Sequence, residues 1–164
     1  IDQSVIFHMI DELGYTVDQV KSLLQEKSGM LGLTGYSDLR EIETAASQGN
    51  EACNLALKMN AYRVKKYIGA YTAAMNGLDA LVFTAGIGEN SDLIRRLICA
   101  DMEFFGIHLD EVKNRIRQQS IREIQSDGAE VSILVVPTNE EIEIAKQSFR
   151  LLSSHLPSQG NSLN

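Results

Sequence analysis

The stretch Leu81-Val82-Phe83-Thr84-Ala85-Gly86-Ile87-Gly88-Glu89-Asn90-Ser91 organises the rest of the sequence. The apolar run from Leu78 to Phe83 has the composition of a buried strand. Two glycines one residue apart follow it, and Asn90-Ser91-Asp92 then resembles a helix N-cap. Glycine at positions 86 and 88 permits positive φ and close approach of a ligand to the backbone. A strand, a glycine turn and a helix N-terminus suit phosphates and nucleotides, although an ordinary capped turn explains the same residues equally well.

The composition fits a globular domain and argues against several kinds of partner. The 164 residues are 44% hydrophobic and 23% charged, which suits one domain with a sizeable core. No apolar run approaches the roughly 20 residues of a membrane span, and no secretory signal opens the sequence. The net charge of −7 leaves no basic stripe for nucleic acid. Cys53 and Cys99 lack metal-ligand spacing, so we expect reduced core thiols in a cytoplasmic protein.

Two short helices are predicted at the beginning of the chain. The first covers residues 4–13, with His8 as a packed side chain. Thr16-Val17-Asp18-Gln19 forms a capping box that opens the second, which continues to Glu26. This pair predicts a small surface subdomain or a contact between subunits.

A glycine-rich loop comes next and ends beside an arginine. Glycines at 29, 32 and 35 predict the loop, and Ser37 can cap a helix that continues through Ala46. Capping accounts for Ser37 and Asp38 but leaves Arg40 unexplained. A guanidinium at a loop–helix junction can stack on a nucleotide base, whereas the alternative interpretation is an exposed helix charge.

The rest of the sequence alternates helices with strands, which predicts an α/β fold. A long helix over residues 50–75 carries an apolar stripe and ends at Gly77. The stripe consists of Cys53, Leu57, Ala61, Val64, Ile68, Tyr71 and Met75. Later predicted elements are a helix from Ser91 to about Phe105, weak strands at 107–109 and 121–125, a polar helix capped by Asp110, a strong strand from Val131 to Val136, a helix capped by Thr138 with Glu141 and running to Leu152, and a polar tail from Ser153.

Two strand-to-helix corners, at Gly86 and at Thr138, are expected at the carboxyl ends of neighbouring strands. Ligands bind at that edge of open α/β sheets. Glu140 lies in the first turn of the last helix, where a carboxylate favours the helix dipole. Capping is one interpretation of Glu140, and a role with Asn139 in holding a hydrated Mg²⁺ is the other.

Several separated motifs together resemble the C-terminal part of the acetate kinase family, which includes propionate and butyrate kinases. The resemblance covers the chain from about Ile1 to Leu152. The matching pieces are Ser28-Gly29-Met30-Leu31-Gly32-Leu33-Thr34-Gly35, Ser37-Asp38-Leu39-Arg40, Tyr62-Arg63-Val64-Lys65-Lys66-Tyr67-Ile68-Gly69-Ala70-Tyr71, the stretch Phe83 to Ser91, and Pro137-Thr138-Asn139-Glu140-Glu141.

The resemblance implies a fold, a domain division and a set of site residues. The fold would be the actin-like (acetate and sugar kinase) ATPase fold, with a ribonuclease H-like sheet flanked by helices. Residues 1–152 would be most of the nucleotide-binding domain of a two-domain kinase, and 153–164 a tail. The implied adenosine-binding residues are Asp38, Leu39 and Arg40 with Gly86, Ile87, Gly88, Glu89 and Asn90, and the implied Mg²⁺-associated carboxylate is Glu140.

The implied activity is transfer of the γ-phosphoryl group of ATP to acetate, giving acetyl phosphate and ADP. By resemblance the catalytic arginine and the groups that bind the acyl phosphate precede Ile1, so we expect a fragment that has no catalytic residue and is inactive alone. Family members are homodimers, so a homodimer is expected here. Acetate and propionate are not distinguished by these residues.

Two other kinds of function remain open. A Rossmann dinucleotide site would use Gly86, Gly88 and Asp110, but Ser91 stands in place of the third glycine and Glu89 would face a pyrophosphate. A non-catalytic dimerisation module would use the long helix and the helical pair at residues 4–26.

Overall fold

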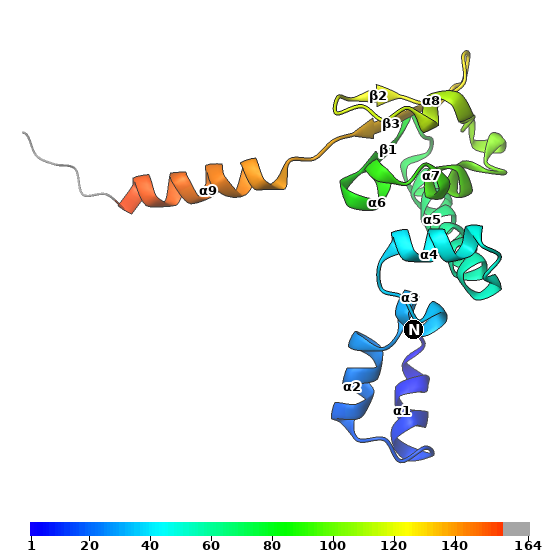
Figure 1. The fold of residues 1–164 in the computed structure, drawn as a ribbon, viewed down its shortest axis with the longest axis vertical. Coiled ribbons are helices and arrows are strands. Elements are labelled where there is room, and N and C mark those ends of the chain that lie inside the picture. Colours follow the sequence, from blue (N-terminus) through cyan, green and yellow to red (C-terminus); the bar gives the residue numbers. More distant parts are fainter. Residues whose placement is uncertain (156–164) are drawn as a thin grey trace, which may run out of the picture.

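The structure is a computed structural model that describes residues 1–155. Figure 1 shows a body built around a small sheet, a helical hairpin extending from it, and a last helix that projects to one side. Within the described residues, every helix is either too short or too polar to span a bilayer. The elements are α1 (Gln3–Asp11), α2 (Val17–Glu26), α3 (Gly29–Thr34), α4 (Leu39–Ser47), α5 (Glu51–Met75), β1 (Ala80–Thr84), α6 (Ala85–Asn90), α7 (Asp92–Cys99), the 3₁₀ turn η1 (Glu103–Phe105), α8 (Glu111–Arg115), β2 (Arg122–Glu123), β3 (Ser132–Val136) and α9 (Glu140–His155).

The sheet has three strands in the order β1-β3-β2. β1 and β3 are parallel, with Ala80 opposite Ser132 and Thr84 opposite Val136, whereas β2 is antiparallel to β3. The Thr84 hydroxyl donates to the carbonyl oxygen of Val136 at 2.9 Å. The corners that follow β1 and β3 therefore lie side by side at one edge, as the sequence predicted.

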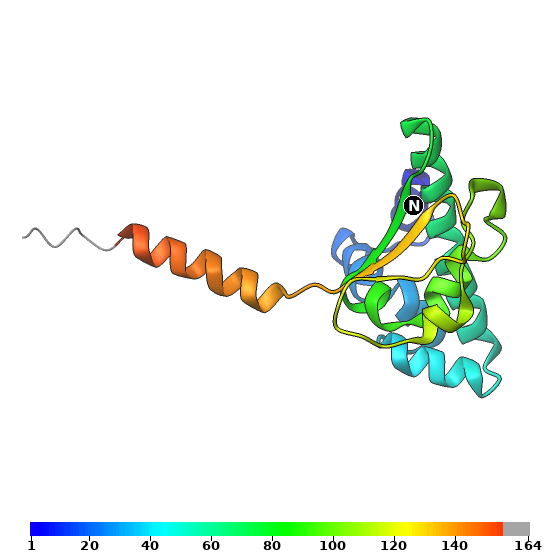
Figure 2. The same ribbon diagram turned by 90° about the horizontal axis from the view of Figure 1, so that it is seen from above.

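The core lies between the sheet and the helices α4, α5 and α7 (Figure 2). Burial alternates along β3, where Ile133 and Val135 are fully enclosed, as expected for a strand whose alternate side chains face the core. Cys53 and Cys99 are free thiols in this core, which confirms their predicted place. Burial raises the pKa of Cys99 to about 12, so this thiol stays protonated and unreactive at neutral pH.

The apolar stripe of α5 is buried only in part. Its members from Cys53 to Ile68 contact the core, but Tyr71 and Met75 are 61% and 62% exposed. The predicted apolar stripe is therefore buried only as far as Ile68, because no described element covers the last two turns of the helix. Asn76, rather than Gly77, caps the helix in a left-handed conformation.

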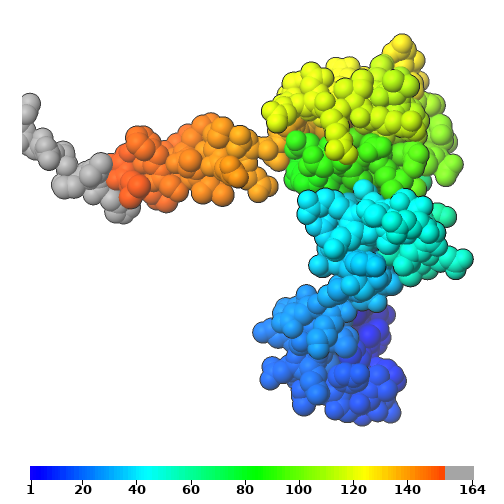
Figure 3. Space-filling model, in the orientation of Figure 1, coloured from blue at the N-terminus to red at the C-terminus, as the bar shows by residue number. Residues whose placement is uncertain are grey.

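The first two helices form a hairpin with the predicted capping box, and this hairpin lies at the end of the molecule away from the sheet (Figure 3). Thr16 Oγ1 accepts from the Gln19 amide at 3.2 Å, and the Gln19 side chain accepts from the Thr16 amide at 2.8 Å. Met9 and Val20 are the buried side chains of the pair. His8 is exposed, so its prediction as a packed residue was wrong: the small buried face of this hairpin does not include it.

The glycine-rich segment is a helix and not the predicted loop. α3 covers Gly29–Thr34 and is capped at its C-terminal end by Gly35, whose φ is +80°. A Cβ at Gly32 would lie 2.8 Å from the Lys27 carbonyl oxygen, so glycine allows this turn to close on the preceding chain. Asp38, and not Ser37, then caps α4, because its carboxylate accepts from the Arg40 amide at 2.8 Å.

Three further predictions are corrected in the second half. α7 ends at Cys99 rather than near Phe105, because Ala100 is extended and Asp101 has a φ of +54°. Asn139, and not Thr138, caps α9 by accepting from the Ile142 amide at 3.0 Å. α9 continues through His155, so the predicted tail begins later than expected, and its residues 156–164 lie outside the described part.

Candidate functional site

The corner after β1 is a short helix. α6 begins immediately after Thr84, and the residue with positive φ is Ala85, at +58°. Neither Gly86 nor Gly88 adopts the positive φ that glycine permits. The two glycines have other roles: a Cβ on Gly88 would come within 3.3 Å of the Phe83 backbone, whereas one on Gly86 would meet no atom within 4 Å. Gly88 thus allows α6 to pack on β1, and Gly86 leaves backbone open to a ligand.

A buried arginine holds the far end of α6. Arg95, on α7, is only 2% exposed. Its Nη1 donates to the carbonyl oxygens of Gly88 at 2.8 Å and Glu89 at 2.9 Å, and its remaining bonds go to Asn114. Burial lowers the pKa of Arg95, and the neighbouring Arg122 adds to this effect. The carbonyls at the end of α6, which lack partners within the helix, are thereby satisfied.

Sequence reasoning missed Arg95, although a signal was present. Arg95 lies four residues after Ser91 and four before Cys99, and residues at that spacing share one face of a helix. Because Cys99 was predicted to be in the core, Arg95 belonged on the buried side. A buried arginine requires several acceptors, and main-chain carbonyls supply them here.

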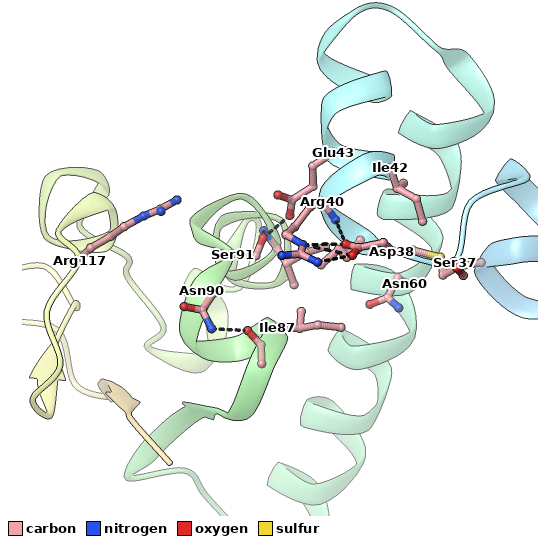
Figure 4. Close-up of a pocket in the computed structure, with 14 residues that line it drawn as sticks. Ser37, Asp38, Arg40, Ile42, Glu43, Asn60, Ile87, Asn90, Ser91 and Arg117 are labelled. Carbon is pink, nitrogen blue, oxygen red and sulfur yellow. Dashed lines mark hydrogen bonds and ion pairs between the residues drawn. The ribbon is translucent and has the colours of Figure 1, made fainter. Parts of the chain in front are cut away.

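Arg40, in the first turn of α4, is paired with Asp38, the N-cap residue of the same helix. Arg40 Nε donates to Asp38 Oδ1 at 3.0 Å, and Arg40 Nη2 pairs with Oδ2 of the same carboxylate (Figure 4). Hydrogen bonds from Arg40 lower the pKa of Asp38 to about 2. The Arg40 side chain remains 89% exposed, so the flat face of its guanidinium is open to a stacking partner.

These segments enclose a cleft between α4, α5 and α6. Its volume of about 790 Å³ falls in the range of small-molecule sites. Three predicted residues from α4 and its cap, Asp38, Leu39 and Arg40, face three from α6, Gly86, Ile87 and Asn90. The lining residues are Met30, Ser37, Asp38, Leu39, Arg40, Ile42, Glu43, Asn60, Gly86, Ile87, Asn90, Ser91, Ile94 and Arg117.

The remaining predicted residues lie outside this lining. Gly88 and Glu89 turn their carbonyl oxygens toward Arg95, on the other side of α6. Glu140 opens α9 beyond the second corner. That corner contacts α6, because the Thr138 amide donates to Glu89 Oε2 at 3.4 Å. Among residues 1–155, no group of three or more ligating side chains is gathered to hold a metal ion.

Glu43 and Ser91 join the two walls of the cleft, and sequence reasoning missed the link. The Ser91 hydroxyl donates to Glu43 Oε1 across the boundary between α4 and α7. The same Ser91 oxygen caps α7 by accepting from the Ile94 amide at 3.0 Å. Glu43 resembles any polar helix residue in the sequence, so no local signal marked it.

Asn60, on α5, is a second cleft residue that sequence reasoning missed. It lies three residues after Leu57 and four before Val64, on the side of α5 that carries the apolar stripe. The signal was thus a polar residue at a position where the helical period calls for an apolar one.

The chain matches known proteins over most of its length. Residues 1–146 match the family model described as the acetokinase family. The chain is 63% identical to the acetate kinase of Flavobacterium johnsoniae over 94% of its length, and 49% identical to that of Carboxydothermus hydrogenoformans over 93%. It spans only 39% and 38% of those two relatives.

Solved structures give the same result. An acetate kinase from Porphyromonas gingivalis matches 93% of this chain with a TM-score of 0.82 and 43% identity, and the match covers 38% of that protein. A propionate kinase from Francisella tularensis matches 90% with a TM-score of 0.81 and 37% identity, over 37% of its own chain. The expected actin-like ATPase fold is thereby confirmed. On both the sequence and the structural match, this chain belongs to the acetokinase family.

Proposed function

We propose that the chain is the nucleotide-binding half of an acetate kinase, which transfers the γ-phosphoryl group of ATP reversibly to acetate and forms acetyl phosphate and ADP. The observation that carries the proposal is the cleft in which residues 38–40 face Gly86, Ile87 and Asn90. The alternative is that propionate or butyrate is the acceptor. The structural similarity to a propionate kinase supports this alternative.

Several of the predicted nucleotide-binding residues have distinct roles in this proposal. The exposed guanidinium of Arg40 stacks on the base, and Asp38 fixes its plane through two hydrogen bonds. Ile87 contacts the base from the opposite wall, while the open backbone at Gly86 lets the ribose approach. Gly88 and Glu89 act indirectly, because Arg95 holds their carbonyls and thereby the position of α6.

Mg²⁺ would bind to this chain through few protein ligands. Glu140 would hold it through water, and Mg²⁺ keeps several waters beside one or two carboxylates. When bound, the ion supplies charge neutralisation on the phosphates. The hydrogen bond between Thr138 and Glu89 ties the segment before Glu140 to α6. Phosphoryl transfer depends on positioning of donor and acceptor, and the acceptor groups are proposed to lie in the part of the relatives that this chain does not span.

The subunit arrangement and location are also proposals. α5 carries exposed apolar side chains, including Tyr62, Tyr67 and Met75, and a homodimer formed through this helix would bury them. The two buried, unpaired thiols suit the reducing cytoplasm. Sedimentation analysis of the chain, with Tyr62→Glu as the disrupting variant, tests the dimer.

Calorimetric titration with ADP, ATP and NAD tests the nucleotide proposal. Binding of ADP and ATP with no binding of NAD is expected. NAD binding as tight as ADP binding would instead favour a dinucleotide site, and no binding of any of the three would contradict the proposal.

A further inference from the structure

Asn60 breaks the local pattern of the longest helix. α5 runs for 25 residues, and Cys53, Leu57 and Ala61 on the same side are at most 2% exposed. Asparagine ranks low in helix propensity, and a polar side chain next to a core costs stability unless it is satisfied. Natural sequences break such local rules mainly at functional sites. The residue is half-buried and lines the cleft.

The Asn60 amide has its hydrogen-bonding capacity free. No hydrogen bond joins its side chain to any residue in the described range 1–155, whereas Asn90, the other asparagine of the cleft, donates to the Gly86 carbonyl oxygen at 2.8 Å. Figure 4 shows Asn60 between the side chains of Asp38 and Ile87. An amide therefore faces the same space as the guanidinium of Arg40 and the apolar side chain of Ile87.

We infer that Asn60 reads the polar edge of the nucleotide base. This inference rests on the proposed function and adds a specificity-determining residue to it. The amide presents one acceptor and two donors in a plane. Its oxygen accepts from the 6-amino group of adenine, and its nitrogen donates to an adjacent ring nitrogen, a pairing in which asparagine is complementary to adenine. Arg40 and Ile87 hold the two faces of the base, so Asn60 supplies recognition that stacking alone does not.

Two polar neighbours of Asn60 in the cleft already have partners. Glu43 is engaged by the Ser91 hydroxyl, and Asp38 is engaged by Arg40. Met30, Leu39 and Ile87 contribute apolar surface to the cleft. A base that enters this space meets an unengaged amide at Asn60, and desolvating that amide without a partner would cost binding energy.

A thermodynamic cycle tests the inference. The full chain and its Asn60→Leu variant are titrated with ADP and with purine riboside 5′-diphosphate, which lacks only the 6-amino group. We expect the wild type to bind ADP about tenfold more tightly than the amino-less analogue. We expect Asn60→Leu, which is close to isosteric, to bind the two equally.

Further variants separate recognition from folding. Asn60→Asp keeps the acceptor for the amino group, so it should retain part of the preference for ADP. Met59→Leu, at the adjacent and 47% exposed position, should retain all of it. Leucine favours helix more than asparagine, so the melting temperature of Asn60→Leu should equal or exceed that of the wild type. Should this variant fold poorly, Asn60→Ala repeats the cycle.

The outcomes are distinguishable. A preference for ADP that is equal in the wild type and Asn60→Leu would overturn the inference while leaving the nucleotide site intact. A wild type that binds both ligands equally would also overturn it. Failure of the wild type to bind either nucleotide would overturn the proposed function, and this inference with it.

Discussion

Arg95 and Gly88 are joined through the protein interior: the guanidinium on α7 donates to the carbonyl oxygen on α6 at 2.8 Å. Because Arg95 also bonds Glu89 and Asn114, one side chain sets the position of the segment that lines the cleft between α4, α5 and α6. Lysine has no planar fork with which to reach all of these acceptors.

Arg95→Lys should therefore destabilise the fold and weaken ADP binding together. Leaving buried carbonyls without donors costs about 1–3 kcal/mol each, so a loss of about 3 kcal/mol in the free energy of unfolding is expected. Urea unfolding and ADP titration measure the two effects. Arg96→Lys, at the adjacent exposed position, is the matched control, and equal stability of the two variants would contradict this account of Arg95.

Ala85→Gly should stabilise the chain. Ala85 has a φ of +58°, a conformation that costs about 1 kcal/mol or more for a residue with a Cβ and little for glycine. An increase of about 1 kcal/mol in the free energy of unfolding is expected in urea. Ala80→Gly, in the extended conformation of β1, should lose stability instead. A loss in both variants would show that the corner after β1 is not strained.

Gly86→Val and Gly88→Val should fail in different ways. A Cβ at position 86 would meet no atom within 4 Å, and Gly86 lines the cleft, so we expect the fold to survive and ADP binding to be lost. At position 88 a Cβ would come within 3.3 Å of the Phe83 backbone, so the melting temperature falls. An ADP affinity for folded Gly86→Val within about twofold of the parent would remove Gly86 from the site.

Arg40→Lys should weaken ADP binding although the charge is unchanged. Lysine has no planar face to stack on a base, and it cannot form the paired contact that Arg40 makes with Asp38. Arg63→Lys, on the exposed surface of α5, should leave the affinity unchanged. Equal binding by Arg40→Lys and the wild type would make Arg40 an ordinary surface charge.

The ion pair of Asp38 predicts a contribution to stability that changes with pH only in the acid range. The folded-state pKa is lowered from 3.8 to about 2, so the carboxylate contributes its stability above pH 3.8, and this contribution is lost as the pH falls toward 2. The melting temperature of the wild type minus that of Asp38→Asn should be small, constant from pH 7 to pH 5, and should shrink below pH 4. A difference that grows toward acid would have the wrong sign for this ion pair.

Local chemistry explains which parts of this structure the sequence predicted. The capping box at Thr16 and the strand that ends at Val136 depend on neighbours in the sequence, and both were found. The pairing of the corners followed from general rules for parallel strands. The sequence also grouped Asp38 to Arg40 with Gly86 to Asn90, but through a family resemblance rather than through geometry.

Tertiary contacts explain what the sequence did not predict. Nothing local marks Glu43 as the partner of Ser91, 48 positions away. α3 was predicted to be a loop because its glycines lower helix propensity, yet Gly32 is needed where the turn approaches Lys27. Ala85 violates the expectation that positive φ belongs to glycine. The apolar stripe of α5 includes the exposed residues Tyr71 and Met75, because periodicity alone does not show how far other elements cover a helix.

The projection of α9 has a consequence for cooperativity. Every side chain from Glu140 to Ser153 is exposed, so this helix lacks the buried apolar face from which most helices in proteins take their stability. Its amide hydrogens should exchange with solvent through local opening, in seconds or less, whereas those of β3 should exchange only through global unfolding. Heating this chain would melt two units rather than one: first an isolated helix with a broad transition, then a packed body with a sharp one.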